Sequence, residues 1–194
     1  MSKTDYTSLK NVDSIKYLGM WIDKKGKYEI HVKNMIDKFR QVMPKLYQIR
    51  NFLKITICKS WIESYLRYGI ENYGNTSTTW KHKLQKTQNK ILKILFKAKS
   101  AEQIRKEQRL LNVENLWKYT ITLQNYFKLK MRYESNKLSS KLRKEHLQLP
   151  LWRNKFGKMK EAYYSIKNFN ELPKETKTIN PYNTLKRELL HLWV

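Results

Sequence analysis

The chain has 194 residues, enough for one domain that buries roughly 70% of its unfolded surface. Hydrophobic residues make up 40% of the sequence and aromatic residues 13%, which excludes a wholly disordered chain; 5 Gly and 4 Pro are too few for a β-sandwich. Lys and Arg number 41 against 16 Asp and Glu, and the net charge of +25 indicates an anionic partner, most simply nucleic acid. AT-rich codon usage is the alternative source of so many lysines.

Cysteine and histidine usage argues against disulfides and metal sites. Cys58 is the single cysteine, so neither an internal disulfide nor a zinc knuckle can form. The four histidines are scattered without ligand spacing, and we expect no cofactor. The N-terminus lacks the apolar core of a signal peptide, and no stretch of about 18 apolar residues exists. We therefore expect an intracellular protein, nuclear rather than cytoplasmic, with no membrane partner.

The first half of the chain predicts a short strand followed by helices. Residues 14–22 are apolar and β-prone and predict a strand or one arm of a hairpin, with a turn at 24–27. A helical face then runs through Val32, Met35, Ile36, Phe39, Val42, Met43, Leu46 and Ile49. Pro44 predicts a kink or break in that helix. A second helix is expected over 56–68, with its inward face formed by Ile57, Trp61, Ile62, Tyr65 and Leu66.

A helix expected over 80–98 carries the most informative pattern, after a predicted loop at 69–79. Its expected buried face consists of Leu84, Gln88, Ile91, Leu92, Leu95 and Phe96. Five lysines follow the opposite face at steps of three and four residues: Lys83, Lys86, Lys90, Lys93 and Lys97. Such a row of cations is spaced to follow a phosphate backbone and contains no carboxylate for i,i+4 pairing. The alternative is an ordinary solvated helix face.

The second half predicts more helix and some strand. Ser100 and Gln103 resemble a capping box that opens a helix reaching Leu111. A longer helix is expected over 114–133, where apolar residues and Lys130 recur at helical spacing. Residues 147–152 and 163–166 are predicted as short strands. Asn180 as N-cap, with Pro181 in the first turn, starts a terminal helix that reaches Trp193.

The residues needed for catalysis are not arranged for it. Polymerisation requires carboxylates that hold two metal ions, but the four aspartates lie within the first 37 residues and no two are adjacent. No aromatic-x-Asp-Asp turn, glycine-rich phosphate loop or nucleophile–base pattern is recognisable. We therefore expect that the chain is not an enzyme.

Four motifs, in order, resemble the reverse transcriptases of LINE-like, jockey-like non-LTR retrotransposons. Residues 15–23 (IKYLGMWID) resemble the primer-grip strand after the palm, and residues 28–31 (YEIH) the aromatic and histidine that follow it. Residues 68–74 (YGIENYG) resemble the family's YGIE-x-WG stretch, with Tyr73 in place of tryptophan. Residues 84–94 resemble an LQ-x-x-QNK-x-L helix, and residues 169–173 (FNELP) a WN-x-LP motif.

The resemblance implies a segment that follows the palm and lacks palm, fingers and endonuclease. It divides the chain into a primer-grip-like strand or hairpin (1–27), a helical thumb-like body (28–135) and a C-terminal appendage with a terminal helix (136–194). We thus predict a mainly α fold: a helical bundle with a short N-terminal hairpin or strand and a small mixed appendage. By resemblance, Tyr17, Leu18 and Gly19 join the five lysines as candidate nucleic-acid contacts.

Three functions remain open from the sequence. The first is a clamp that grips the backbone of an RNA, DNA or RNA–DNA duplex without reading its sequence. Lysines outnumber arginines 32 to 9, which fits point contacts to phosphates better than bidentate base contacts. The second is a domesticated interaction subunit of a larger assembly, with other protein subunits such as a palm and fingers polypeptide as partners. A basic membrane-surface binder ranks lowest, because no helix combines a strong apolar face with an anchor.

Overall fold

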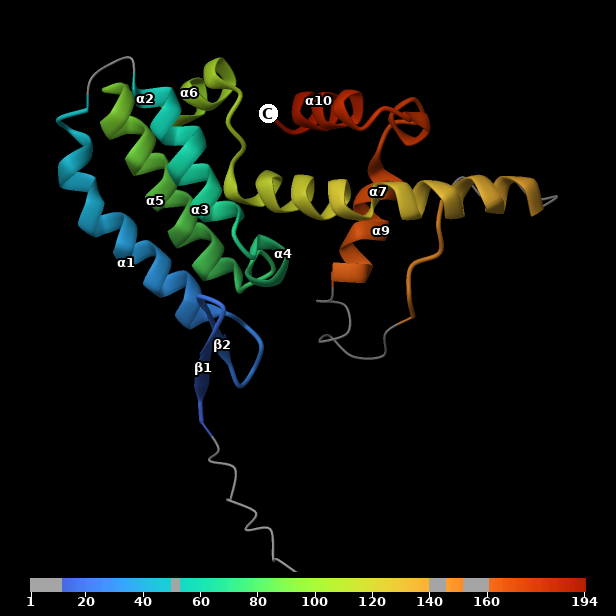
Figure 1. Cartoon of the computed structure of the whole chain (residues 1–194), viewed down its shortest axis with the longest axis horizontal. Helices are drawn as coiled ribbons and strands as arrows, with labels where there is room; N and C mark the ends of the chain where they lie inside the picture. Colours follow the sequence, from blue (N-terminus) through green and yellow to red (C-terminus); the bar gives the residue numbers. More distant parts are fainter. Residues whose placement is uncertain (1–11, 50–52, 140–145, 152–160) are drawn as a thin grey trace, which may run out of the picture.

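The structure, a computed structural model, describes residues 12–49, 53–139, 146–151 and 161–194. The predicted class is confirmed: the described chain is mainly α-helical, with one short antiparallel hairpin at its N-terminal end. A group of helices packs with the hairpin at one end, and the long helix α7 leads from this group to the C-terminal helices (Figure 1). Within the described residues, no helix is long and apolar enough to cross a membrane.

The hairpin consists of β1 (Ser14–Tyr17) and β2 (Met20–Asp23), which pair antiparallel. The turn between them is Leu18-Gly19, and both residues have positive φ angles of 43° and 80°. Two successive positive φ angles are the geometry that matches the twist of paired strands. The segment predicted as a strand or one arm of a hairpin therefore forms both arms, and the predicted turn at residues 24–27 follows the second strand.

Helix α1 (Glu29–Leu46) packs lengthwise on α5 (Thr78–Phe96). The predicted inner face of α1 is largely buried, although Val42 and Ile49 are only half-buried. Pro44 lies inside the helix, where it cannot donate to the Arg40 carbonyl, and the helix ends two residues later at Leu46. The predicted break therefore falls just beyond the proline.

The next helix is irregular. It comprises α2 (Lys54–Ile57), a π-helical stretch η2 (Cys58–Glu63) and α3 (Ser64–Arg67). The wider turn brings Cys58, Ile62 and Leu66 to the core, whereas Trp61, predicted to face inward, is 38% exposed. Residues 69–79 were predicted as a loop, but they contain α4 (Ile70–Tyr73) and the first residues of α5.

The predicted cap and long helix are present. Ser100 is the N-cap of α6 (Ala101–Gln108), and its hydroxyl accepts the backbone N–H of Gln103 at 3.3 Å. The Gln103 amide donates to Glu107 instead of closing the reciprocal half of the capping box. Helix α7 (Val113–Ser139) contacts α3, α4 and α5 of the helical body and also packs against α9 and α10.

The C-terminal segment corrects two predictions. Residues 163–166, predicted as a strand, lie inside α9 (Glu161–Glu171), because Ile166, Phe169 and Leu172 recur at helical spacing against α7. Residues 147–151, the described part of the other predicted strand, have no regular structure, and Trp152 lies outside the described residues. The described part of the appendage is therefore helical rather than mixed.

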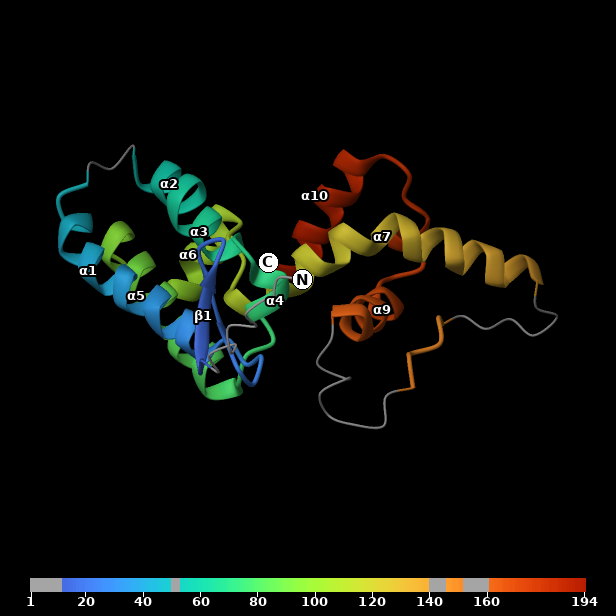
Figure 2. The same cartoon turned by 60° about the horizontal axis from the view of Figure 1, so that its bottom comes forward.

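Helix α10 (Tyr182–Trp193) completes the fold. It runs antiparallel to α7, since the Tyr182 ring lies 6.4 Å from Phe127 and the Trp193 carbonyl accepts from Asn115. Helices α9 and α10 lie on opposite sides of α7 (Figure 2). Pro181, not Asn180, occupies the N-cap position. The division between a body of residues 28–135 and an appendage of residues 136–194 stays a prediction.

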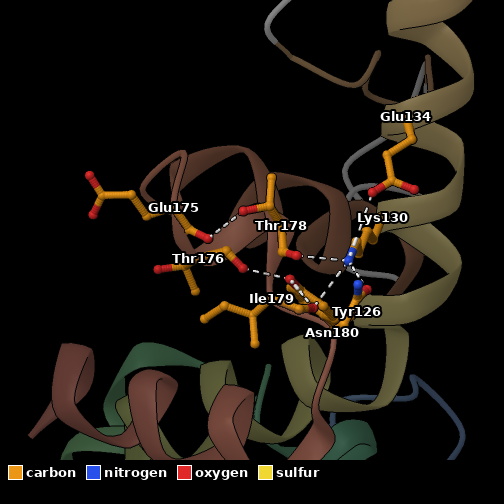
Figure 3. A network of polar contacts seen from close by, with 8 residues as sticks. All are labelled: Tyr126, Lys130, Glu134, Glu175, Thr176, Thr178, Ile179 and Asn180. Carbon is orange, nitrogen blue, oxygen red and sulfur yellow. Dashed lines mark hydrogen bonds and ion pairs between the residues drawn. The ribbon is translucent and has the colours of Figure 1, made fainter.

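A buried lysine fixes the segment before α10. Lys130 of α7 is 5% exposed, and its ammonium donates to the Thr178 and Ile179 carbonyls at 2.9 and 3.2 Å. It also bonds the Asn180 side chain and lies 3.7 Å from the Glu134 carboxylate (Figure 3). These carbonyls lie at the end of the short 3₁₀ helix η3 (Thr176–Thr178), and the Ile179 carbonyl also accepts from the Tyr126 hydroxyl at 3.1 Å. The lysine thus acts as a C-terminal cap from a distant helix.

Candidate nucleic-acid interface

The predicted lysine ridge lies along the exposed face of α5. All five of its lysines are exposed: Lys83, Lys86, Lys90, Lys93 and Lys97. Leu84, Ile91 and Leu95 are buried on the opposite face, as predicted, and Thr87 and Ile94 are buried as well. Fourteen residues separate the ends of the ridge, so at 1.5 Å per residue it spans about 21 Å. That length matches about six phosphates along one strand of a duplex.

The ridge lysines keep their positive charge without a paired carboxylate among the described residues. Among the ion pairs of the described residues, none involves a ridge lysine. The Lys83 ammonium lies 4.1 Å from the centre of the Trp80 ring, an attraction that leaves its positive charge in place. The ridge is therefore a continuous positive surface.

The other candidate contacts lie at the hairpin, separate from the ridge. Tyr17 and Leu18 are 61% and 71% exposed. The Tyr68 hydroxyl donates to the Leu18 carbonyl, and a side chain at Gly19 would lie 3.6 Å from the Tyr68 ring. The turn is thus held by the junction between α3 and α4. Within the described part of the chain, no hydrogen bond links this turn to the ridge lysines.

The first two resembling motifs pack against each other. Gly69 has a φ of 68°, and an added Cβ there would lie 2.0 Å from the Met20 sulfur. Asp23 accepts the backbone N–H groups of Lys27 and Glu29 at 2.9 and 3.2 Å, which fixes the entry into α1. These contacts give the motif residues structural roles that need no ligand.

His31 is buried beneath the hairpin. Its side chain is 6% exposed, Nδ1 accepts the Trp21 N–H at 3.5 Å, and the Tyr73 ring lies 5.2 Å away. Nε2 has no hydrogen-bond partner. Burial, with a smaller contribution from the Lys38 charge, lowers the pKa of His31 below its usual value. The folded state therefore favours the neutral imidazole.

Protonation of His31 is expected to destabilise the fold in acid. Because the folded pKa is lowered, the unfolded chain binds the proton first, and stability is lost as pH falls below about 6.5. The loss can reach about 1.4 kcal/mol per pH unit. Urea unfolding between pH 7 and pH 5 measures it. His31→Gln should flatten the dependence, and the same substitution at exposed His146 should not; equal slopes in all three proteins would contradict the assignment.

The amides of the third motif hold the start of α7. Gln88 is buried and donates to the Leu111 carbonyl at 2.9 Å. Gln85 accepts the Val113 N–H at 2.8 Å and donates to Asn89 at 2.8 Å. In the fourth motif, Asn170 exchanges two 2.8 Å hydrogen bonds with the backbone of Leu147. These polar groups are satisfied internally and are not available to a ligand.

A basic cavity beside the ridge was not predicted. It measures about 260 Å³ and is lined by Thr78, Lys81, His82, Gln85, Arg105, Asn112, Val113 and Glu114. Lys81 and Arg105 are half-buried in it. The two cations are 24 positions apart in the sequence, so no local pattern could have joined them. The one available signal was that Lys81 and His82 precede the ridge on the same helix.

The described residues contain no cluster of three or more His, Cys, Asp or Glu that could hold a metal ion. The Cys58 thiol is buried, and burial, followed by the Glu63 charge, raises its pKa to about 12. A thiol with so high a pKa is a poor nucleophile.

No protein-family model, no curated protein and no solved structure matches this chain.

Proposed function

We propose that this chain is a non-catalytic nucleic-acid-binding segment of a retrotransposon-type reverse transcriptase, which grips the phosphate backbone without reading sequence. The observation that carries the binding function is the exposed lysine ridge of α5, whose lysines form no ion pair with any residue that the structure describes. The reverse-transcriptase origin rests on the ordered motifs alone.

Physical chemistry favours phosphates as the ligand of the ridge. Successive ridge lysines rise about 4.5–6 Å along α5, so long flexible side chains can each reach a different phosphate. Lysine contacts act as point charges and fix position rather than base identity. With a net charge of +25 behind them, they should bind most polyanions of sufficient length.

A salt titration of duplex binding tests this function. If five to eight phosphates are bound, log K should fall against log salt with a slope of about −4 to −7, for RNA, DNA and hybrid duplexes alike. The Lys86→Ala, Lys90→Ala, Lys93→Ala triple variant should reduce that slope by about three units, roughly one for each lysine–phosphate pair removed. Its stability should change little, because exposed substitutions usually shift it by less than about 0.5 kcal/mol each.

The matched control removes the same charge elsewhere. Lys128, Lys167 and Lys186 are exposed on α7, α9 and α10. Their triple alanine variant should keep a slope closer to that of the wild type. Equal slopes for the two triple variants would mean that net charge alone governs binding, and the ridge would lose its role.

The hairpin supports a second candidate, a domesticated interaction subunit. Ile15, Tyr17 and Leu18 are all more than half exposed on one short hairpin. Exposed apolar residues that cluster in this way can mark a protein contact. A partner that binds through the hairpin would lose affinity on Leu18→Asp, whereas duplex binding through the ridge would not.

A further inference from the structure

The basic cavity lies where three helices meet. Thr78, Lys81 and His82 come from the first turns of α5, Arg105 from α6, and Asn112 to Glu114 from the start of α7. Its position is fixed by Gln85, which links α5 to the Val113 N–H, and by the Asn112 side chain, which caps Asn115 at 2.7 Å. The cavity is thus built by the packing of the body rather than by a free loop.

Two cations line this cavity without a carboxylate partner. Lys81 lies 4.7 Å from the centre of the Trp117 ring, and Arg105 donates to the Asn89 side chain. Neither forms an ion pair with any described residue. Burial lowers the pKa of both groups, which reflects the loss of solvation around their charges. Two partly desolvated cations at one cavity favour an anion between them.

The acidic residues nearby each form an ion pair with another lysine, although, against the larger effect of burial, the Glu114 and Glu102 charges also raise the pKa of Lys81 and Arg105. Glu114 also lines the cavity, but its carboxylate lies 3.5 Å from Lys118. Glu102, on the same helix as Arg105, pairs with Lys106 at 3.3 Å. The cavity also faces the N-terminus of α7, a helix of 27 residues whose dipole adds positive potential there. The balance of charge at the cavity is therefore positive.

The cavity and the ridge lie on neighbouring faces of α5. At about 100° per residue, His82 lies between the cavity face of α5, which carries Lys81 and Gln85, and the ridge face, which carries Lys86 and Lys90. A phosphate held in the cavity can therefore belong to a polyanion that continues along the ridge.

We propose that this cavity is a phosphate-binding site in which Lys81 and Arg105 together hold one phosphate group. The phosphate of a nucleic acid that lies on the ridge is one source, and this assignment rests on the proposed function. Free phosphate is the other source, and it shares the same recognition chemistry: an oxyanion accepts from the Lys81 ammonium and the Arg105 guanidinium.

Thermal unfolding in inorganic phosphate tests the site itself. At matched ionic strength, phosphate at about ten times its dissociation constant should raise Tm by about 3–6 °C over chloride. The Lys81→Gln, Arg105→Gln double variant should lose this difference, and the Lys81→Arg, Arg105→Lys exchange should keep it. The matched control is the Lys128→Gln, Lys186→Gln double variant, which removes two charges from exposed positions on α7 and α10 and should keep the difference too.

The outcomes separate the site from the proposed function. No phosphate-specific rise in the wild type, or an equal rise in the folded Lys81→Gln, Arg105→Gln variant, would overturn the site whatever the ridge variants show. A rise that depends on both cations supports it, even if duplex binding fails. If the Lys81→Gln, Arg105→Gln variant also binds duplex at least tenfold more weakly than the Lys128→Gln, Lys186→Gln control, the phosphate belongs to nucleic acid. Duplex affinity equal to that of the control would refute that source and leave free phosphate.

Discussion

Replacing Gly74 with alanine is expected to destabilise the fold by about 3 kcal/mol or more. A Cβ at this position would lie 2.2 Å from Cδ1 of Trp117 and 2.5 Å from the Ile70 carbonyl oxygen. The Trp117 ring is 3% exposed and packs against Tyr164 at 4.8 Å, so it cannot move away. Overpacking a rigid core typically costs about 1–3 kcal/mol and sometimes more. Urea unfolding of the variant measures the loss.

The control separates steric overlap from backbone strain. Gly74 has an ordinary φ of −62°, so the expected loss is steric. Gly26 has a φ of 62° and open space where a Cβ would stand, so Gly26→Ala should cost only about 1–2 kcal/mol, through strain. Trp117→Leu should make room for the new methyl group, and the double variant should lose less than the sum of the single losses. A Gly74→Ala protein as stable as the wild type would refute the close packing.

The helices of the body were predictable because their signals are local. Leu84, Ile91 and Leu95 repeat at the helical period, and a chain that buries one face must place the intervening lysines outside. Ser100 lies at a cap because its hydroxyl needs only the N–H three residues later. Neither inference needs knowledge of the rest of the fold.

The elements that were missed depend on distant contacts. α4 is a single turn within a Gly- and Asn-rich stretch, and the burial of Tyr73, whose hydroxyl bonds the Leu66 carbonyl, holds it in place. Residues 163–166 are β-prone, but α9 forms because Ile166 and Phe169 find partners on α7. Packing overrides local preference in both cases.

The candidate site also has one part that local sequence signals predict and one part that depends on distant contacts. The ridge could be predicted because its lysines share one helix. The cavity could not, because Arg105 reaches it from α6 and the start of α7 closes it. The hairpin contacts inferred from resemblance remain a prediction, and the Tyr68 hydroxyl, which donates to the Leu18 carbonyl, holds their turn at the junction between α3 and α4.

Replacing Lys130 with methionine is expected to cost about 1–3 kcal/mol and to loosen the C-terminal segment. Methionine keeps most of the apolar stem but removes the charged donor of the Thr178 and Ile179 carbonyls, and only Ile179 keeps a second donor, the Tyr126 hydroxyl. Hydrogen bonds to a charged group contribute about 1.5–3 kcal/mol, and the relief of a buried charge offsets part of the loss. Lys128 is exposed two residues earlier on α7, so Lys128→Met is the matched control and should stay within about 0.5 kcal/mol of the wild type.

The loss of stability in the Lys130→Met protein should be larger in the C-terminal segment than in the helical body. The Lys130 ammonium holds the residues that lead into α10, so the amides of α10 should lose protection from hydrogen exchange before those of α5. Equal stability of the Lys130→Met and Lys128→Met proteins would show that the carbonyls find other partners.

A double-mutant cycle with Tyr126 tests whether the network acts as a unit. The Tyr126 hydroxyl donates to the Thr176 and Ile179 carbonyls at 2.5 and 3.1 Å, so it shares the Ile179 carbonyl with Lys130 (Figure 3). Tyr126→Phe alone should cost about 1–2 kcal/mol. After Lys130→Met has already released the segment, the loss of the hydroxyl should matter less, and the combined cost should fall short of the sum by about 0.5 kcal/mol or more. Strictly additive losses would mean that the two side chains hold the segment independently.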